Sequence, residues 1–238
     1  MKKILALILA LVCALSLAAC GKNNDDTKTD PEPTPDPQPA VTTAEFTHGY
    51  VDMALELPEG WSWEQVSDTG SDKTEGIKFY KTDDPTVSYT LLCWTGGYGI
   101  CGTGVTSEEL TLSNGMKVWQ YTEEDAQKGT IWADIVFEDT PGSYVAAPSE
   151  EMTTEVWNAN RDALLSILGT AQIGRKSVTM QAAIDAAKAQ YTGEYDMAYA
   201  TYDVTAGAWT VSFSKGTAGE KATRLVVDAA GKVMAAGK

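Results

Sequence analysis

The stretch Tyr50 to Leu57, YVDMALEL, gives the clearest structural signal in this chain of 238 residues. Every second residue in it is a large apolar one: Val51, Met53, Leu55 and Leu57. Side chains of a strand point alternately to its two faces, so a period of two predicts a half-buried β-strand. Pro58-Glu59-Gly60 follows and predicts a turn that ends the strand.

Working outward, similar short apolar segments predict more strands at 76–81, 87–94, 110–112, 116–121, 129–137 and 143–147. Asn114-Gly115 favours a type I′ hairpin turn between two of them. At these strand positions we expect Trp119 and Trp132 to lie in the core. Apolar residues then recur at helical spacing up to Leu168, which predicts a helix with Ser149 as its N-cap and Gly169 at its end. Residues 171–173 could return to the sheet.

A second region, 177–238, has the same kinds of element in a different order, a helix followed by strands. Thr179 is the expected N-cap of a helix that reaches Gln190. Alternating segments at 197–204, 209–213, 224–228 and 232–235 predict strands. We therefore expect an α+β fold with two small antiparallel-sheet-plus-helix domains, 46–174 and 177–238.

The N-terminus has the pattern of an export signal. Lys2 and Lys3 precede an almost wholly apolar stretch, 4–19, that ends in small residues. A spanning helix needs about 20 apolar residues, so a permanent transmembrane helix is the poorer interpretation.

Leu17-Ala18-Ala19-Cys20-Gly21 resembles the lipobox of bacterial lipoproteins. The resemblance implies that residues 1–19 are removed and that Cys20 carries a lipid, which would hold the protein on the extracytoplasmic face of a cell membrane. An ordinary signal peptide with a chance cysteine is the alternative. Residues 20–45 then form a disordered tether, because DPEPTPDPQPA (30–40) favours extended polyproline II and offers no core.

The formal net charge is −15, and it becomes −17 when Lys2 and Lys3 leave with the signal. An acidic surface repels phosphate backbones, so nucleic acid is not an expected partner.

Only Cys93 and Cys101 remain once Cys13 is removed and Cys20 is lipidated. A cysteine pair in an exported chain predicts a structural disulfide, and two free thiols are the alternative. The spacing is not Cys-x-x-Cys, so an active redox site does not fit. The enclosed loop is glycine-rich and contains three candidate ligand-binding residues: Trp94, Gly97 and Tyr98.

Three segments of the second region resemble a PepSY domain: TMQAAI (179–184), WTVSF (209–213) and VVDAAGKV (226–233). The resemblance implies binding of a protein or peptide, including restraint of a protease, and it brings no catalytic residues. LPEGWSW (57–63) is faintly similar to domains of the PsbP and Mog1 type, from which we carry no function.

No residue pattern predicts catalysis, a metal site or a cofactor. His48 is the single histidine, and nothing around it suggests a nucleophile. Phosphate-binding and calcium-binding loop motifs do not occur. We therefore expect a non-enzymatic lipoprotein that binds a protein or peptide. The alternative is a glycan-binding or small-ligand-binding lipoprotein that uses the aromatic cystine loop, and an enzyme is the third hypothesis.

Overall fold

The structure is a computed structural model that describes residues 40–67, 74–94, 98–216 and 222–234. The predicted signal peptide, the lipidation site Cys20 and most of the predicted tether lie outside these residues, as does Gly97. Residues 39–238 form one compact unit. Within the described ranges, no helix is both long and apolar enough to span a membrane.

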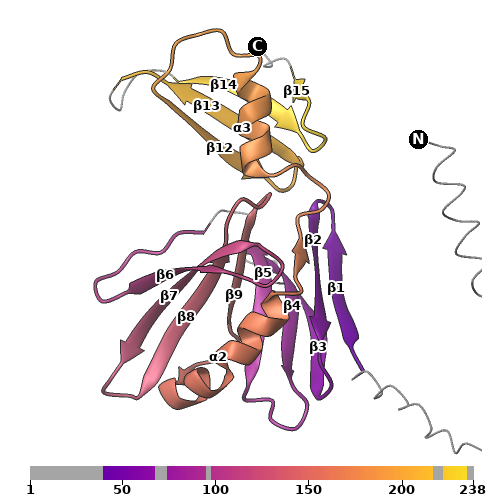
Figure 1. Cartoon of the computed structure of the whole chain (residues 1–238), viewed down its shortest axis with the longest axis vertical. Coiled ribbons are helices and arrows are strands. Elements are labelled where there is room, and N and C mark those ends of the chain that lie inside the picture. The colour runs from indigo at the N-terminus through magenta and orange to yellow at the C-terminus, as the bar shows by residue number, and fades with distance from the viewer. Residues whose placement is uncertain (1–39, 68–73, 95–97, 217–221, 235–238) are drawn as a thin grey trace, which may run out of the picture. The chain divides into compact units, whose positions relative to one another are not determined.

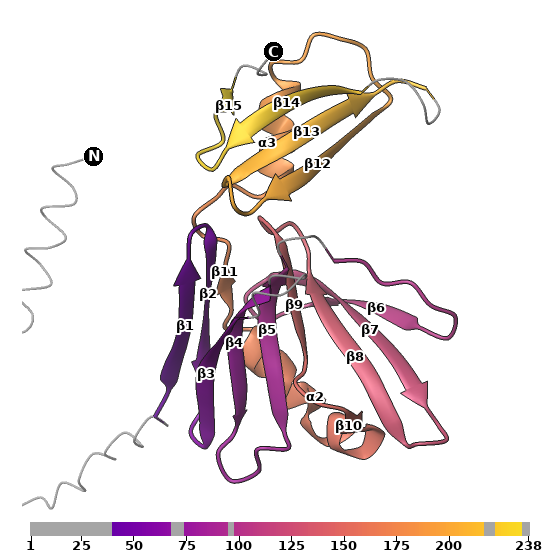
Figure 2. The same cartoon turned by 180° about the vertical axis from the view of Figure 1, so that it is seen from behind.

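The first lobe, residues 42–173, contains two antiparallel sheets (Figures 1 and 2). The smaller sheet has the order β1-β2-β11, with β1 at Thr42–His48, β2 at Val51–Leu57 and β11 at Gln172–Ile173. The larger sheet has eight strands in the order β3-β4-β5-β9-β8-β7-β6, and β10 pairs with β8 beside this path. Its strands are β3 (Trp61–Ser67), β4 (Thr74–Lys81), β5 (Ser88–Trp94), β6 (Thr106–Thr111), β7 (Lys117–Asp125), β8 (Thr130–Phe137), β9 (Ser143–Pro148) and β10 (Met152–Thr153).

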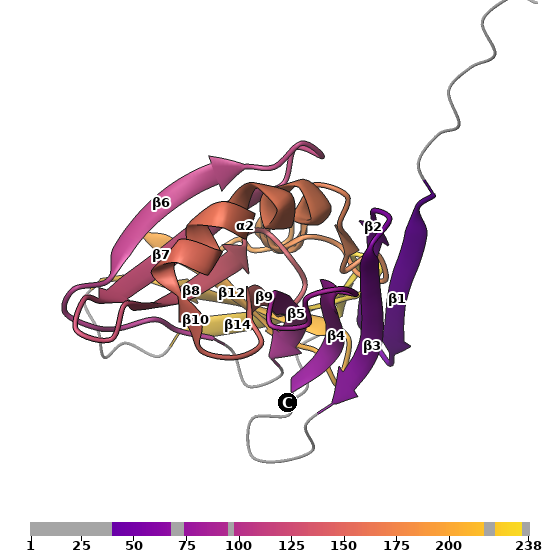
Figure 3. The ribbon, with the colours of Figure 1, turned by 90° about the horizontal axis from the view of Figure 1, so that it is seen from below.

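The helix α2, Thr154–Leu168, packs against both β2 and β8 and closes the core of this lobe (Figure 3). Trp157, Leu164 and Leu168 on its inner face are buried. On β4 and β5, alternate residues face the core, and these side chains are fully buried: Ile77, Phe79, Tyr89, Leu91 and Cys93. On these two strands, the alternation of apolar residues therefore places every second side chain on one packed face of the larger sheet.

The second lobe, residues 178–234, has its own hydrophobic core. The helix α3, Met180–Lys188, covers one face of a four-stranded sheet of order β12-β13-β14-β15 (Figure 1). These strands are β12 (Met197–Asp203), β13 (Ala208–Ser214), β14 (Thr223–Asp228) and β15 (Val233–Met234). Thr179 caps α3 as expected, because its hydroxyl accepts a hydrogen bond from the Ala182 N–H at 3.3 Å.

The expected α+β fold class is wrong, because the chain is mostly β, with three antiparallel sheets and only two helices in the described residues. Two strands account for much of the difference. In β1 only Ala44 and Phe46 are buried, and in β3 no residue is, so neither segment shows a strong apolar alternation.

Two boundaries also differ from the expectation. β1 begins at Thr42, so the last residues of the predicted 20–45 tether belong to the folded unit. Ser149 is not the N-cap of the first helix, because residues 152–153 form β10 and the cap is Thr153. Its hydroxyl accepts a hydrogen bond from the Val156 N–H at 3.3 Å. Gly169 is the C-cap, as predicted.

Candidate functional site: a cavity between the two lobes

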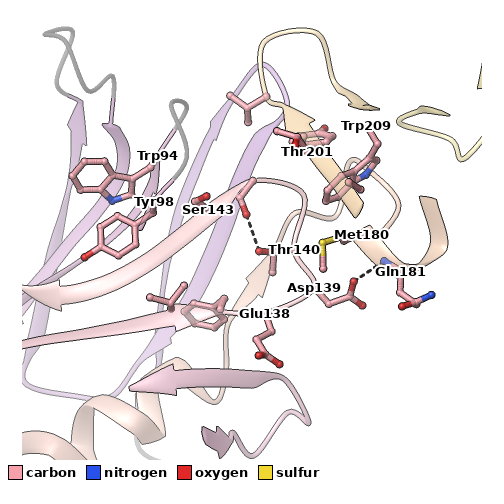
Figure 4. Close-up of a pocket in the computed structure, with 16 residues that line it drawn as sticks. Trp94, Tyr98, Glu138, Asp139, Thr140, Ser143, Met180, Gln181, Thr201 and Trp209 are labelled. Atoms are coloured by element: carbon pink, nitrogen blue, oxygen red, sulfur yellow. Dashed lines mark hydrogen bonds between the residues drawn. The ribbon is translucent and has the colours of Figure 1, made fainter. Parts of the chain in front are cut away.

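A cavity of about 710 Å³ lies where the two lobes meet (Figure 4). We call it the interlobe cavity. The first lobe supplies the end of β5 and the turn between β8 and β9. The second lobe supplies the start of α3 and parts of β12 and β13. The volume is typical of sites that hold small ligands.

One side of the interlobe cavity is formed by Trp94 and Tyr98. Trp94 is the last residue of β5, and the two ring centroids lie 5.1 Å apart at an interplanar angle of 55°. Both side chains are partly exposed, so their ring faces remain accessible. Two of the three predicted ligand-binding residues therefore line one cavity, and the third, Gly97, lies outside the described residues.

The other side holds a second aromatic pair, Tyr202 and Trp209, with centroids 4.8 Å apart. The Trp209 indole N–H donates a hydrogen bond to the Val178 carbonyl at 2.9 Å, and the Tyr202 hydroxyl bonds to the Ser177 hydroxyl. These bonds fix both rings before any ligand arrives. No pattern in the sequence joins this pair to Trp94, because only the packing of the lobes brings them together.

Asp139 joins the two lobes at the edge of the cavity. It lies in the turn after β8 with a φ of 52°, a left-handed conformation that few residues other than glycine adopt. Its carboxylate accepts a hydrogen bond of 2.8 Å from the Gln181 N–H, in the first turn of α3. A carboxylate is favourable there because the free N–H groups at a helix N-terminus carry partial positive charge. Figure 4 shows this contact beside Met180.

The segment between the lobes is fixed by Asp52, a residue that sequence reasoning missed. Alternation in YVDMALEL places Asp52 on the polar face of β2, yet it is only 1% exposed. Its carboxylate accepts a hydrogen bond from the Arg175 Nε at 2.7 Å and another from the Lys176 N–H at 3.3 Å. The second lobe also touches the first where Gly207 approaches Tyr50, and a Cβ on Gly207 would lie 2.3 Å from that ring.

The disulfide predicted between Cys93 and Cys101 is not formed, and both residues are free thiols. The Cys93 side chain is fully buried on the core-facing side of β5, whereas Cys101 is exposed, so the two thiols lie in different environments. Burial raises the pKa of the Cys93 thiol to about 12. The thiolate is the reactive form, so Cys93 is chemically inert in the folded protein.

Two other aromatic residues differ from the expectation. Trp132 is 40% exposed rather than in the core. Trp119 is half-buried outside the main core, and its indole N–H donates a hydrogen bond to Glu138. On β8 the core-facing phase is taken by Ile131, Ala133 and Ile135, so Trp132 points to the opposite face.

His48 lies on the surface, where its Nδ1 is 2.9 Å from the Glu75 carboxylate. No nucleophile that the structure describes bonds to its ring. The first lobe therefore places His48 on the surface, with the Glu75 carboxylate as its hydrogen-bond partner.

Comparisons with family models, with curated proteins and with solved structures find no match to this chain.

Proposed function

We propose that this protein is a membrane-anchored, extracytoplasmic binding lipoprotein that holds a small hydroxylated ligand, such as a glycan unit, in the interlobe cavity. The observation that supports this function is the pair of aromatic side chains, Trp94 and Tyr98, on the wall of a cavity large enough for a small ligand. The anchor at Cys20 is proposed from the lipobox resemblance alone.

The chemistry of the lining supports a ligand with a flat apolar face and polar edges. Aromatic rings stack on the C–H face of a sugar ring, which is apolar, and Trp94 offers such a face. Hydroxyl groups of Thr140, Ser143 and Thr201 line the same cavity and can exchange hydrogen bonds with ligand hydroxyls. Glu138 and Asp139 add negative charge, which disfavours an anionic ligand.

A glycan array probed with the full chain tests the proposal. The chain is kept in a polyoxyethylene detergent, which has neither a sugar nor a charged headgroup. We expect one group of related glycans to bind, and we expect Trp94→Ala to lower that binding at least about tenfold, in line with the loss of a buried aromatic contact. Tyr199→Ala, which removes an exposed tyrosine from β12, is the matched control and should bind normally.

A second variant distinguishes the loss of the binding site from a folding defect in Trp94→Ala. Thr201 is exposed at the cavity, so Thr201→Trp should fill the space without disturbing either core. Loss of binding in Thr201→Trp, with unchanged circular dichroism, would support the site. An array on which no glycan binds, or binding that survives both variants, would contradict the proposed function.

A protein or peptide partner is the second candidate, and it is favoured by the edge of the second lobe. Among the described residues, β12 pairs only with β13, which leaves its other edge open. Met197 and Tyr199 on β12 are 61% and 46% exposed. An extended peptide can add to such an edge through backbone hydrogen bonds, as the PepSY resemblance, including restraint of a protease, would require.

Photocrosslinking in the native envelope tests this candidate. A benzoylphenylalanine at Tyr199 should form one discrete adduct, and Ala198→Pro should abolish it, because proline disturbs the strand that the partner pairs with. The same crosslinker at Glu56, an exposed residue of β2, is the control. Equal adducts at both positions, or none at Tyr199, would count against a partner on this edge.

A further inference from the structure

A second cavity, of about 880 Å³, lies at the far end of β7 and β8 from the interlobe cavity. We call it the acidic cavity. Six carboxylate side chains line it: Glu123, Glu124, Asp125, Asp134, Glu150 and Glu151. Among the described residues that line it, Lys128 is the only basic one, and its Nζ lies 3.5 Å from Asp125. The site therefore has a strong excess of negative charge.

Trp132 lies between a carboxylate of the neighbouring strand β7 and one from the residue that precedes β10. In the register of β7 and β8, Glu123 is directly opposite Trp132. On the other side, Met152 of β10 pairs with Ile131, so the preceding residue, Glu151, comes beside Trp132. With 40% of its surface exposed, the indole presents a face to this acidic surrounding. An aromatic face flanked by carboxylates is the arrangement that attracts an organic cation.

Two buried polar groups point to a ligand independently of the acidic rim. Asp134 lines the acidic cavity but is only 4% exposed, and no hydrogen bond from a described residue holds its carboxylate. The Ser149 hydroxyl oxygen lines the same cavity and is buried without a hydrogen-bond partner in the described structure. Buried polar groups are almost always hydrogen-bonded, so the unpartnered Ser149 hydroxyl oxygen indicates a missing partner in this cavity. The Asp134 carboxyl, which lines the same cavity, is available to that partner.

We propose that the acidic cavity binds a small organic cation through its alkylammonium group, which stacks on Trp132 and pairs with the carboxylates of Glu123 and Asp134. An alkylammonium group donates to Asp134 and the Ser149 hydroxyl where it has N–H groups, and its carbon-bound hydrogens contact the indole face. Although six carboxylates line the cavity, no three metal-ligating side chains among the described residues are arranged so that they could hold a metal ion, so an organic cation suits the site better.

Saturation-transfer NMR with tetramethylammonium as the probe tests the proposal on the full chain in polyoxyethylene detergent at pH 8. Empty micelles give the background, and tert-butyl alcohol is a neutral probe of nearly the same size. We expect saturable transfer to tetramethylammonium and much weaker transfer to the alcohol. Raising the salt concentration from roughly 20 mM to roughly 300 mM should weaken binding severalfold, because the attraction is electrostatic.

Variants locate the site. Trp132→Leu should weaken binding at least about fivefold, which is the range of a cation–π contact. Trp132→Phe should retain part of the affinity, and Asp134→Asn should weaken binding at pH 8. Tyr199→Leu and Glu194→Gln, on the second lobe, are matched controls for an exposed aromatic residue and an exposed acid, and they should bind as the unaltered protein does.

Four results would overturn the proposal. The first is the absence of saturable binding of tetramethylammonium and of n-butylammonium. The second is equal binding of the neutral alcohol. The third is full affinity in a folded Trp132→Leu variant. Binding of a lysine-containing peptide without binding of either free amine would also overturn it, because the occupant would then be a peptide segment. Variants of the interlobe cavity, such as Thr201→Trp, should leave all these results unchanged.

Discussion

Asp134 holds a carboxyl group in a place where its charge is costly. Burial raises its pKa to about 7 from an ordinary value of 3.8, with no hydrogen bond or neighbouring charge contributing to the shift. The titratable side chains around it are Tyr121 and Glu123 from β7, with Glu151 beyond β9 and Lys128 on the rim. A group that weakens folding at neutral pH and lines a cavity is typical of a functional site.

Because its pKa is raised in the folded state, the Asp134 carboxyl favours folding below about pH 4, and that contribution is lost as the pH rises through 7. Asp134→Asn removes the titration. Between pH 5 and pH 8 we therefore expect the variant to gain about 2 kcal/mol of unfolding free energy relative to the unaltered protein. Urea unfolding at both pH values measures this. Glu59→Gln, in an exposed turn, should show no such difference, and equal curves for Asp134→Asn would contradict the assignment.

The two cysteines of the first lobe should differ in reactivity. Since Cys93 is buried with a raised pKa and Cys101 is exposed, iodoacetamide should label Cys101 within minutes and Cys93 only in denaturant. Peptide mapping by mass spectrometry distinguishes the two sites. Protection of both thiols until a reductant is added would show instead that the pair is oxidised in solution.

At the scale of elements, α3 depends on a residue of the other lobe. Thr179 satisfies one free N–H of its first turn, and Asp139 satisfies another while supplying negative charge. The left-handed φ of Asp139 costs some energy, so the contact offsets a strained backbone.

We expect Asp139→Ala to lower the unfolding free energy by about 1–2 kcal/mol, the usual cost of losing a helix cap. Asp139→Asn keeps the acceptor oxygen and tolerates a positive φ, so it should lose much less. Chemical unfolding followed by circular dichroism gives both values. If the two variants are equally stable, the contact with the Gln181 N–H contributes nothing.

At the scale of the whole molecule, the bond between Arg175 and Asp52 fixes the segment that joins the two lobes. Arg175→Ala leaves the buried Asp52 carboxylate with one hydrogen bond from the described residues, donated by the Lys176 N–H. Because the guanidinium is partly exposed, we expect a loss of about 2 kcal/mol, below the usual cost of breaking a fully buried pair. Lys176→Ala removes only a surface bond to the Gly49 carbonyl and should cost less than about 1 kcal/mol.

Limited proteolysis gives a second measure of the same change. Thermolysin cleaves before apolar residues, so Val178 is a natural target in the joining segment. Cleavage there should be faster in Arg175→Ala than in Lys176→Ala. Equal rates would show that Asp52 does not hold this segment.

Sequence reasoning succeeded where one face of an element is strongly apolar. The strand at Val51–Leu57 and the cap at Thr179 follow from such local patterns. It failed at Trp132, because Ile131 and Trp132 are both apolar and the alternation of β8 does not say which of them faces the core. Trp94 and Tyr98 are predicted from their place in the glycine-rich segment between Cys93 and Cys101. Tyr202, Asp52 and Asp134, by contrast, acquire their roles only through contacts between distant segments.

The edge position of β1 has a mechanical consequence. In the described structure β1 pairs only with β2, through seven register pairs that start at Thr42–Leu57 and end at His48–Val51. Any tension applied to the chain ahead of residue 40 reaches the Thr42–Leu57 pair first and peels the strand from that end. Ala44 and Phe46 would leave the core next, so tension on the N-terminal side directly removes packing contacts from the core of the first lobe.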